Sequence, residues 1–415
     1  MLEIKFLGGA SEVGRSAFLV DTGVEKFLLD YGLNAHSFSF PLPPPLELDA
    51  VFVSHAHLDH CGMLPELYRR GYLKETFGTK TTLQLSDLLI RDSINIQARK
   101  GIAPLYLKSD LVKLEDNSKS LNFKQPLEFA KSVVEFRDAG HIPGSATTLI
   151  DSGTKRLLYT GDLKYLPTDL MNGADRDFID IDALMIDSTY SYANHPDRDL
   201  LTKNLKEEVK RIIENEGTVL LPSFAIGRTQ EMLLVLSEMK IPIYLDGMGI
   251  EATRIILDNP TSIRDPEKLK KAFGRAHKIE EPEDRKKVLE QPSIVIASAG
   301  MLQGGPMHYY LRKLYKKENS LIIFNGYQAE GTSGKTLLEK HRFISGATDM
   351  DVKMQVKYMD FSAHIGRDNI FKFIEKVNPK KIIPVHGSHI PDFVAELKDK
   401  GFDAIAVQNG DTVKI

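Results

Sequence analysis

The segment 54–62, SHAHLDHCG, places three histidines and an aspartate within six consecutive positions. Neutral imidazole nitrogens and carboxylate oxygens are ligands that zinc accepts in four- or five-coordinate sites. His55 and His57 can aim their rings to one side of an extended chain. Asp59 and His60 would lie in the first turn of a helix that starts near Asp59. A surface histidine cluster is the plainer alternative, but so dense a run of donors favours a metal site.

Further metal donors lie far along the chain in similar surroundings. His141 in AGHIPGS, Asp162 in YTGDL and His386 in IIPVHGS each follow a strand-like run, in a turn that contains glycine. Turns of this kind display functional side chains from a rigid support. A single histidine in one such turn would more often be structural. The repetition favours a joint site with the first cluster.

The elements that must position these donors follow from hydrophobic patterning. Short strands dominate the first half, whereas strands and helices alternate after residue 195, as in the βαβ units of a parallel sheet. The mixed-charge segment 264–287 is predicted to be a solvated helical face rather than an RNA-binding patch. The predicted strands are Leu2–Leu7, Ala17–Asp21, Lys26–Asp30, Ala50–Ser54, Val133–Arg137, Ala146–Asp151, Lys155–Thr160, Thr218–Pro222, Ile241–Leu245, Ser293–Ser298, Leu321–Asn325, Ile382–Val385, Ala404–Val407 and Thr412–Ile415. The predicted helices are Leu64–Arg70, Thr81–Lys100, Leu200–Asn215, Thr229–Met239 and Met307–Leu314.

Composition narrows the class of protein. The 415 residues exceed the size at which one core stops growing, so two domains are expected. Hydrophobic residues make up 42% and charged residues 27%, as in ordinary globular proteins. The formal net charge of -3 gives no overall sign of a nucleic-acid partner. The single cysteine, Cys61, excludes an intramolecular disulfide, and no secretion signal or membrane span is evident, so a cytoplasmic protein is expected.

Several motifs resemble those of a known superfamily. HAHLDH at 55–60, with His141, Asp162 and Asp30 in FLLDYG, resembles the motif set of the metallo-β-lactamase superfamily. MIDSTY at 185–190, MDFSAHIGR at 359–367 and PVHG at 384–387 resemble the additional motifs of its β-CASP branch, which comprises nucleases. LPSFAIGRTQEML, ASAGMLQGGP and GYQAEGTSGKTLLE resemble segments of the β-CASP domain.

This resemblance extends from Phe6 to the C-terminus and is greatest to archaeal enzymes related to the cleavage and polyadenylation factor endonuclease and to RNase J. It implies an α/β fold, in which a metallo-β-lactamase αββα sandwich carries an inserted β-CASP domain with a parallel sheet. The implied domains are 1–194, the first part of the sandwich, 195–358, the β-CASP domain, and 359–415, which completes the sandwich.

The resemblance also implies roles for individual residues. His55, His57 and His141 would bind one zinc ion, Asp59, His60 and His386 would bind a second, and Asp162 would bridge the two. Asp30 would orient a ligand from behind. The expected catalytic residues are Asp59, His364, which would protonate the leaving oxygen, and Asp187, which would support His364. Two cations would neutralise a phosphodiester and lower the pKa of a water toward 7.

A second motif admits a different chemistry. AEGTSGKT at 329–336 nearly fits a P-loop, which would make the chain an ATPase, but alanine stands in place of the first glycine. The same segment fits the β-CASP pattern as it stands. Lys335 and the neighbouring backbone could still contact RNA phosphates, and Arg228 and Ser298 are further candidates for such contacts. Arg228 and Ser298 could equally cap or anchor a helix.

The predicted function is a zinc-dependent ribonuclease that acts on single-stranded RNA in processing or decay, as a 5′→3′ exonuclease, an endonuclease or both. It would leave a 5′-phosphate and a 3′-hydroxyl. The alternatives are a small-molecule metallo-hydrolase and a non-catalytic scaffold subunit of an RNA-processing complex. A homodimer and RNA-processing or decay proteins stay open as partners, whereas a membrane is not expected.

Overall fold

The computed structural model describes residues 2–34, 38–99 and 101–415. By its internal contacts the chain forms two compact units. The first unit comprises Met1–Pro167, Asn172–Asn194 and Ala363–Ile415, and the second comprises Thr168–Met171 and His195–Ser362. The domain limits inferred from the family resemblance, 1–194, 195–358 and 359–415, stay a prediction.

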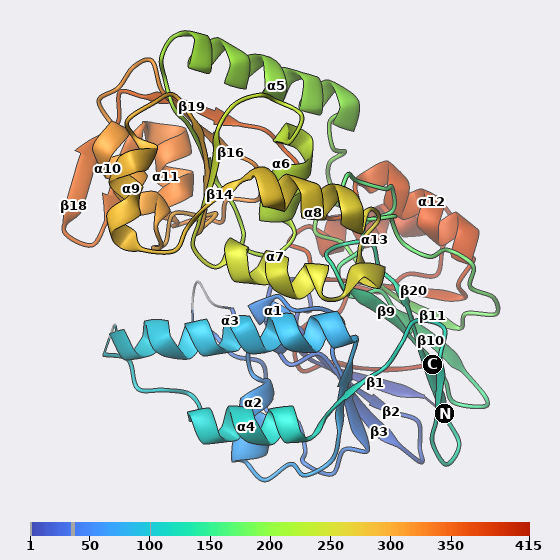
Figure 1. Ribbon diagram of the computed structural model, residues 1–415. Helices are drawn as coiled ribbons and strands as arrows, with labels where there is room; N and C mark the ends of the chain where they lie inside the picture. The colour runs from blue at the N-terminus through green and yellow to red at the C-terminus, as the bar shows by residue number, and fades with distance from the viewer. Residues whose placement is uncertain (1, 35–37, 100) are drawn as a thin grey trace. The chain divides into compact units, whose positions relative to one another are not determined.

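Two sheets form the middle of the first unit within the described residues (Figure 1). In spatial order, the seven-stranded sheet contains β21 (Thr412–Lys414), β1 (Glu3–Gly8), β2 (Ala17–Asp21), β3 (Lys26–Leu29), β4 (Ala50–Phe52), β5 (Thr76–Gly78) and β6 (Ser118–Ser120). The six-stranded sheet contains β20 (Lys381–Val385), β11 (Ala183–Asp187), β10 (Arg156–Tyr159), β9 (Ala146–Asp151), β8 (Val133–Asp138) and β7 (Pro126–Glu128). The helices are α1 (Leu58–Cys61), α2 (Leu64–Arg69), α3 (Lys80–Arg99), α4 (Lys108–Asp116), α12 (Arg367–Val377) and α13 (Ile390–Asp399).

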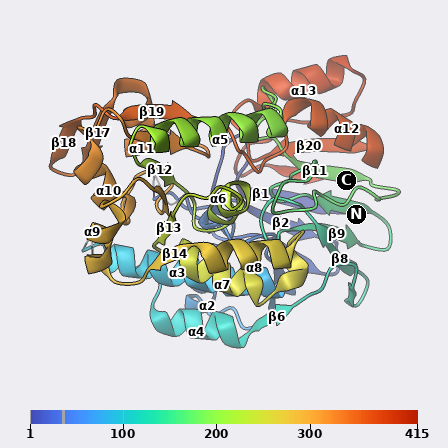
Figure 2. The same ribbon diagram turned by 45° about the horizontal axis from the view of Figure 1, so that its top comes forward.

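In the strands of this unit, successive side chains point to opposite faces of the sheet, and this alternation explains how its layers pack. In β4, Phe52 packs into a core shared with the second sheet, through residues such as Phe136 and Tyr159. The neighbouring Val51 and Val53 face the opposite way and pack with residues of α2, α3 and α4. The outer face of the second sheet is covered by α12 and α13 (Figure 2). Successive side chains of a strand point to opposite faces, so the result is a helix–sheet–sheet–helix sandwich.

The second unit is a three-layer α/β structure around a six-stranded sheet whose neighbouring strands are all parallel. In spatial order, its strands are β14 (His277–Ile279), β13 (Ile243–Asp246), β15 (Ile294–Ala297), β12 (Val219–Pro222), β16 (Leu321–Phe324) and β19 (Gln355–Tyr358). A separate hairpin contains β17 (Arg342–Ser345) and β18 (Thr348–Asp351). The helical segments are α5 (Arg198–Glu214), α6 (Arg228–Leu236), α7 (Gly249–Leu257), η1 (Pro260–Ser262), α8 (Pro266–Arg275), η2 (Pro282–Asp284), α9 (Arg285–Val288), α10 (Met307–Leu314) and α11 (Ser333–Lys340).

Both faces of this parallel sheet are buried. β12, β15 and β16 have no exposed residue, because α5, α6 and α8 cover one face and α9, α10 and α11 cover the other. Continuous apolar runs such as Ile294–Ala297 are typical of strands covered on both sides. The predicted fold class, an αββα sandwich with an α/β parallel-sheet insertion, is confirmed.

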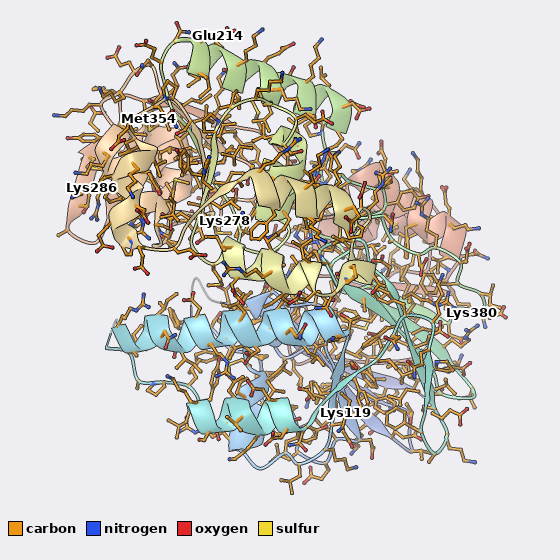
Figure 3. The ribbon with its side chains drawn as sticks, in the orientation of Figure 1. Lys119, Glu214, Lys278, Lys286, Met354 and Lys380 are labelled. Carbon is orange, nitrogen blue, oxygen red and sulfur yellow. The ribbon has the colours of Figure 1, made fainter. Side chains whose placement is uncertain are left out.

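Some predicted elements were wrong or incomplete. Ala404–Val407 is no strand, because only Ala404 makes a β-bridge, with Ile382. The segment 264–287 contains α8 but also β14, an edge strand of the parallel sheet in the second unit. Lys286 of this segment points to solvent, as a solvated face requires (Figure 3). The predicted helix Thr81–Lys100 matches α3 except that Lys100 lies outside the described residues.

Among the described residues, no helix combines the length and the apolar character that crossing a membrane requires.

Candidate metal centre

The predicted donors of the first unit meet at one edge of the sandwich. His55 follows β4 after two residues, and Asp162 follows β10 after two residues. Asp187 ends β11, and His386 directly follows β20. The strands β10, β11 and β20 are parallel neighbours, so their carboxyl ends meet at the same edge. His141 lies in the turn that joins β8 to β9.

Four donors form a first set with the dimensions of a tetrahedral site. His57 Nδ1 lies 3.1 Å from His55 Nε2 and 3.3 Å from His141 Nε2. Asp162 Oδ2 lies 3.4 Å from His55 Nε2 and 3.5 Å from His141 Nε2. Zinc–nitrogen bonds of about 2.0–2.1 Å correspond to a tetrahedron with edges of roughly 3.3–3.4 Å. These residues therefore fit a zinc ion without rearrangement.

A second set lies on the other side of the Asp162 carboxylate. Asp162 Oδ1 is 3.3 Å from His60 Nε2, and it is also 3.3 Å from His386 Nδ1, which is not the ring nitrogen that faces Asp59. Asp59 Oδ2 is 3.2 Å from His386 Nε2 and 4.0 Å from His60 Nε2. Asp162 Oδ1 is buried and accepts no hydrogen bond of good geometry. A buried carboxylate oxygen without a partner is costly unless a cation satisfies it.

Asp30 fixes the orientation of two histidines from behind the donor sets. It is fully buried and has a left-handed backbone conformation, with φ of 58°. Its Oδ2 accepts hydrogen bonds from His60 Nδ1 at 2.7 Å, from the Ser54 hydroxyl at 2.7 Å and from the Tyr159 hydroxyl at 2.6 Å. The Ser54 hydroxyl lies 3.0 Å from His55 Nδ1 and can accept its N–H. The Nε2 atoms of His55 and His60 thereby keep their lone pairs for a metal.

Burial controls the protonation states of the three histidines in the first donor set. Desolvation lowers the pKa of His55 and His141 well below the usual value, and lowers the pKa of His57 to about 4. Burial alone would raise the pKa of Asp162, but the nearby His386 and His60 outweigh it and hold that pKa well below the usual value. The first set is thus three neutral imidazoles and one carboxylate, which are the protonation states that bind metals.

His364 and Asp187 form an acid–base pair beside the donor sets. His364 Nδ1 donates to Asp187 Oδ2 at 2.9 Å, and His364 Nε2 lies 3.9 Å from Asp162 Oδ2. Asp187 Oδ1 also accepts from the hydroxyl of Thr189 at 2.7 Å. Burial lowers the pKa of His364, but Asp187 and Asp162 outweigh it, so the pKa is raised above the usual 6.5. Lys164 Nζ donates to the His364 carbonyl at 3.0 Å and helps to hold this loop.

Close backbone contacts hold the chain turns that carry the donors. A Cβ on Gly32 would lie 1.8 Å from the carbonyl oxygen of Asp59, so only glycine lets the two segments approach. Gly161, with φ of 55°, precedes Asp162 and packs against Ser54. His386 also has a positive φ, of 53°, and its backbone N–H donates to the Gly9 carbonyl. A left-handed conformation in a histidine stores strain that is frequent at functional sites.

The three residues predicted to contact RNA phosphates lie in the second unit. Arg228 is 5% exposed and donates to the carbonyl of Phe361. Lys335 Nζ pairs with Glu330 at 3.1 Å and with Glu339 at 3.0 Å. Ser298 follows β15, and its carbonyl accepts from Met307 N. Contact with RNA by these residues stays a prediction.

The sequence interpretation missed the side chains that support the donors. Ser54 and Tyr159 bind Asp30, Thr189 binds Asp187, and Lys164 binds the His364 backbone. Ser54, Thr189 and Lys164 lie within or next to the quoted motifs, so their adjacency to donors was an available signal. Tyr159 also lies within a quoted motif, YTGDL, but as the last residue of the buried strand β10 it resembles any apolar strand residue.

Comparisons with known proteins assign the family. Residues 229–337 match the Beta-Casp domain, and residues 349–407 match the Zn-dependent metallo-hydrolase RNA specificity domain. The chain is 35% identical to the Probable RNase MJ4 of Methanocaldococcus jannaschii, with 100% of both chains covered. This chain belongs to the β-CASP family.

Other β-CASP relatives cover nearly the whole chain. The RNase aCSPSF2 of Saccharolobus solfataricus is 35% identical over 99% of this chain and 85% of its own length. The transcription termination factor FttA of Pyrococcus horikoshii is 35% identical over 100% of this chain and 71% of its own length. Residues 3–214 also match a family described as the Anti-Pycsar protein Apyc1.

The fold of this β-CASP protein has a counterpart among solved structures. A crystal structure of a protein of unknown function from Enterococcus faecalis V583 aligns over 99% of both chains, with a TM-score of 0.62 and 15% identity. The low identity supports the fold alone. The family expected from the sequence motifs is confirmed.

Proposed function

We propose that this β-CASP protein is a ribonuclease that holds two zinc ions and hydrolyses phosphodiester bonds of single-stranded RNA, in processing or decay. Its products would carry a 5′-phosphate and a 3′-hydroxyl. The observation that supports the proposal is the set His55, His57, His141 and Asp162, with the set Asp59, His60 and His386 next to Asp162 and with His364 and Asp187 directly beside them. The names of the relatives, RNase MJ4 and RNase aCSPSF2, agree with it.

Each group has a defined task in this proposal. His55, His57 and His141 would hold one ion, Asp59, His60 and His386 the other, and Asp162 both, with Asp30 orienting His60. When bound, two ions neutralise the phosphate charge and lower the pKa of water near neutrality. Asp59 is 29% exposed at its side chain, so it lies at the open side of the site, where a substrate phosphate can approach.

His364 supplies the proton that the leaving oxygen needs. Its Nδ1 is bound to Asp187, which fixes the ring and stabilises the protonated form. Its Nε2 lies 3.9 Å from Oδ2 of Asp162, a donor of the first set. A proton at Nε2 can therefore pass to the departing 3′-oxygen of an RNA chain. A small-molecule hydrolase with a good leaving group has less need of such a donor.

The decisive experiment uses one RNA labelled separately at its 5′ and 3′ ends. Each RNA is prepared with a 5′-triphosphate, a 5′-monophosphate or a 5′-hydroxyl. Release of mononucleotides only from monophosphorylated ends establishes the 5′→3′ exonuclease, and internal fragments from every form establish the endonuclease. Intact RNA in all forms, with zinc bound, contradicts the proposal and leaves the scaffold or small-molecule alternatives.

Metal content and assembly state are measured on the same preparation. Elemental analysis should give two zinc ions per chain, and a donor variant such as His141→Ala should lower that number. A content near zero in the active protein would exclude zinc as the resident ion. Light scattering tests whether the chain forms the homodimer that is part of the same proposal.

A further inference from the structure

A series of aromatic rings leads away from His364 within the first unit. The Tyr190 ring centroid lies 6.1 Å from that of His364, and Tyr192 stacks on Tyr190 at 6.0 Å with 18° between the ring planes. His389 follows, with its ring centroid 4.6 Å from that of Tyr192. Tyr190 is 7% exposed, whereas Tyr192 is 54% exposed and His389 is also exposed. The series thus begins at the candidate proton donor and ends in two rings that face solvent.

The loop that carries Tyr192 is held firmly on both sides of that residue. Tyr190 forms a β-bridge with Gly366, and the Arg367 backbone N–H donates to the carbonyl of Ala193 at 3.0 Å. The backbone N–H of Asp368 donates to Asn194 Oδ1 at 2.9 Å. These partners belong to the segment that directly follows His364. The exposed ring of Tyr192 is therefore kept in a fixed place relative to His364.

Single exposed aromatic residues are common on protein surfaces and need no explanation. Here two exposed rings adjoin each other, and both continue a series of neighbouring rings that starts in the candidate site, in which Tyr190 and Tyr192 are stacked and the other pairs are tilted. Less than half of the Tyr192 side chain is buried, so its ring contributes little to the core. Aromatic rings fixed beside a nuclease site have a chemical use, because the bases of single-stranded RNA stack on them.

We propose that Tyr192, with His389 beside it, is a stacking platform for a base of the RNA substrate. This inference rests on the proposed ribonuclease function. The leaving 3′-oxygen belongs to the nucleotide on the 5′ side of the cleaved bond, and His364 protonates that oxygen. Since the rings extend from His364, the base on Tyr192 belongs to the first or second nucleotide on the 5′ side. Every base has an aromatic face, so the platform accepts all four bases.

The test is a double-mutant cycle between the protein and the RNA. RNAs carry one abasic nucleotide, placed in turn at each position around the cleaved bond. Their affinities are measured for proteins with Tyr192 and with Tyr192→Leu, both in a His364→Ala background that keeps the RNA intact. In the protein that keeps Tyr192, an abasic nucleotide at the first or second position on the 5′ side should weaken RNA binding by about 5- to 150-fold. With Tyr192→Leu, the same RNA should bind within about twofold of the normal RNA.

Further variants separate stacking from a general effect on folding. Tyr192→Phe and Tyr192→Trp keep an aromatic face and should keep the abasic penalty. Ile179→Ala, which truncates a side chain that is 69% exposed in the same unit, should leave all affinities unchanged. A 2-aminopurine base at the critical position should lose fluorescence on binding to the protein with Tyr192 but not with Tyr192→Leu.

Failure of the platform is distinguishable from failure of the proposed function. If the wild-type protein cleaves RNA but the abasic penalty is the same with Tyr192 and with Tyr192→Leu, the platform is refuted and the ribonuclease stands. A penalty confined to the 3′ side of the cleaved bond also refutes the platform. If the wild-type protein neither binds nor cleaves RNA, both proposals fall.

Discussion

His364 differs from the other histidines of the site because its Nδ1 is bound to a carboxylate while its Nε2 faces the shared donor Asp162. We predict that His364→Ala lowers turnover about 10²- to 10⁴-fold, which is the usual contribution of a general acid. Zinc content should stay unchanged, because His364 belongs to neither of the two proposed donor sets. Elemental analysis measures the zinc content of the variant, and single-turnover cleavage of labelled RNA measures its rate. Wild-type turnover in this variant would remove His364 from the mechanism.

Asp30 acts on the metal only through the residues that it holds. Asp30→Asn keeps the shape of the side chain but replaces one acceptor oxygen with an N–H donor, which conflicts with His60, Ser54 or Tyr159. We expect a loss of about 10- to 100-fold in zinc affinity, measured by competition with a chromogenic chelator. Tyr159→Phe removes one of the hydrogen bonds to Asp30 and should have a smaller effect. Equal affinities of wild type and Asp30→Asn would contradict the orienting role.

At the scale of elements, the turn after β3 must pass very close to α1. We predict that Gly32→Ala lowers zinc content, because its Cβ would meet the Asp59 carbonyl and displace the turn that carries Asp59 and His60. The loss should be greater for the ion at those residues than for the ion at His55, His57 and His141. The zinc content of Gly32→Ala, measured by elemental analysis after dialysis, should approach one ion per chain. Gly274→Ala in α8 is the control, because a Cβ there meets no atom within 4 Å.

The helix α6 carries a buried carboxylate whose charge stabilises the second unit. Glu231 is fully buried, accepts from Arg198 Nη2 at 2.7 Å and binds the backbone N–H groups of Asp169 and Leu170. Burial raises the pKa of Glu231, but Arg198 and Arg228 outweigh it, so the pKa lies below the ordinary 4.5. A lowered folded-state pKa means that the ionised group stabilises the fold above pH 4.5, and that this contribution is lost as pH falls further.

We therefore predict that Glu231→Gln lowers the free energy of unfolding by about 3–5 kcal/mol at pH 7, because it removes the fully buried charge that pairs with the half-buried Arg198. Below pH 4.5 the stability of the variant should depend less steeply on pH than that of the wild type. Urea titrations between pH 3 and pH 7 measure both quantities. Glu330→Gln removes a carboxylate from a residue whose side chain is 83% exposed, and should change stability by less than about 1 kcal/mol. Parallel pH curves for Glu231→Gln and wild type would contradict the assigned role.

The sequence predicted the elements and donors whose signal is local. Met307–Leu314 was predicted with the bounds that the structure shows, because its apolar residues repeat with a helical period. The donor positions follow from glycine-flanked turns after apolar strands. β14 and the single bridge at Ala404 could not be predicted. Their conformation depends on pairing with another strand and not on the local residue pattern. The hydrogen bond of Tyr159 to Asp30 joins residues 129 positions apart, which no local pattern reveals.

For the whole molecule, metal binding should stabilise one unit more than the other, since the proposed donors all belong to the first unit. A ligand present at 100 times its dissociation constant adds about 2.7 kcal/mol to the stability of the part that binds it. We predict that a chelator lowers the unfolding temperature of the first unit by roughly 5–10 °C and leaves that of the second unit unchanged.

Differential scanning calorimetry with and without the chelator measures this difference, and restoring zinc should reverse it. Hydrogen exchange of the backbone amides in β11 and β12 assigns each transition to its unit. A shift of both transitions by the same amount, or of neither, would contradict the prediction.

The completion of the first unit by its last segment has a consequence for protein synthesis. β20 pairs with β11, β21 pairs with β1, and the segment Ala363–Ile415 supplies both His364 and His386. In the order of synthesis, the candidate proton donor His364 and the proposed metal donor His386 follow the residues of the second unit. Residues His195–Ser362 of the second unit, by contrast, are contiguous and emerge earlier. The candidate site of this protein therefore cannot assemble until the second unit has been synthesised.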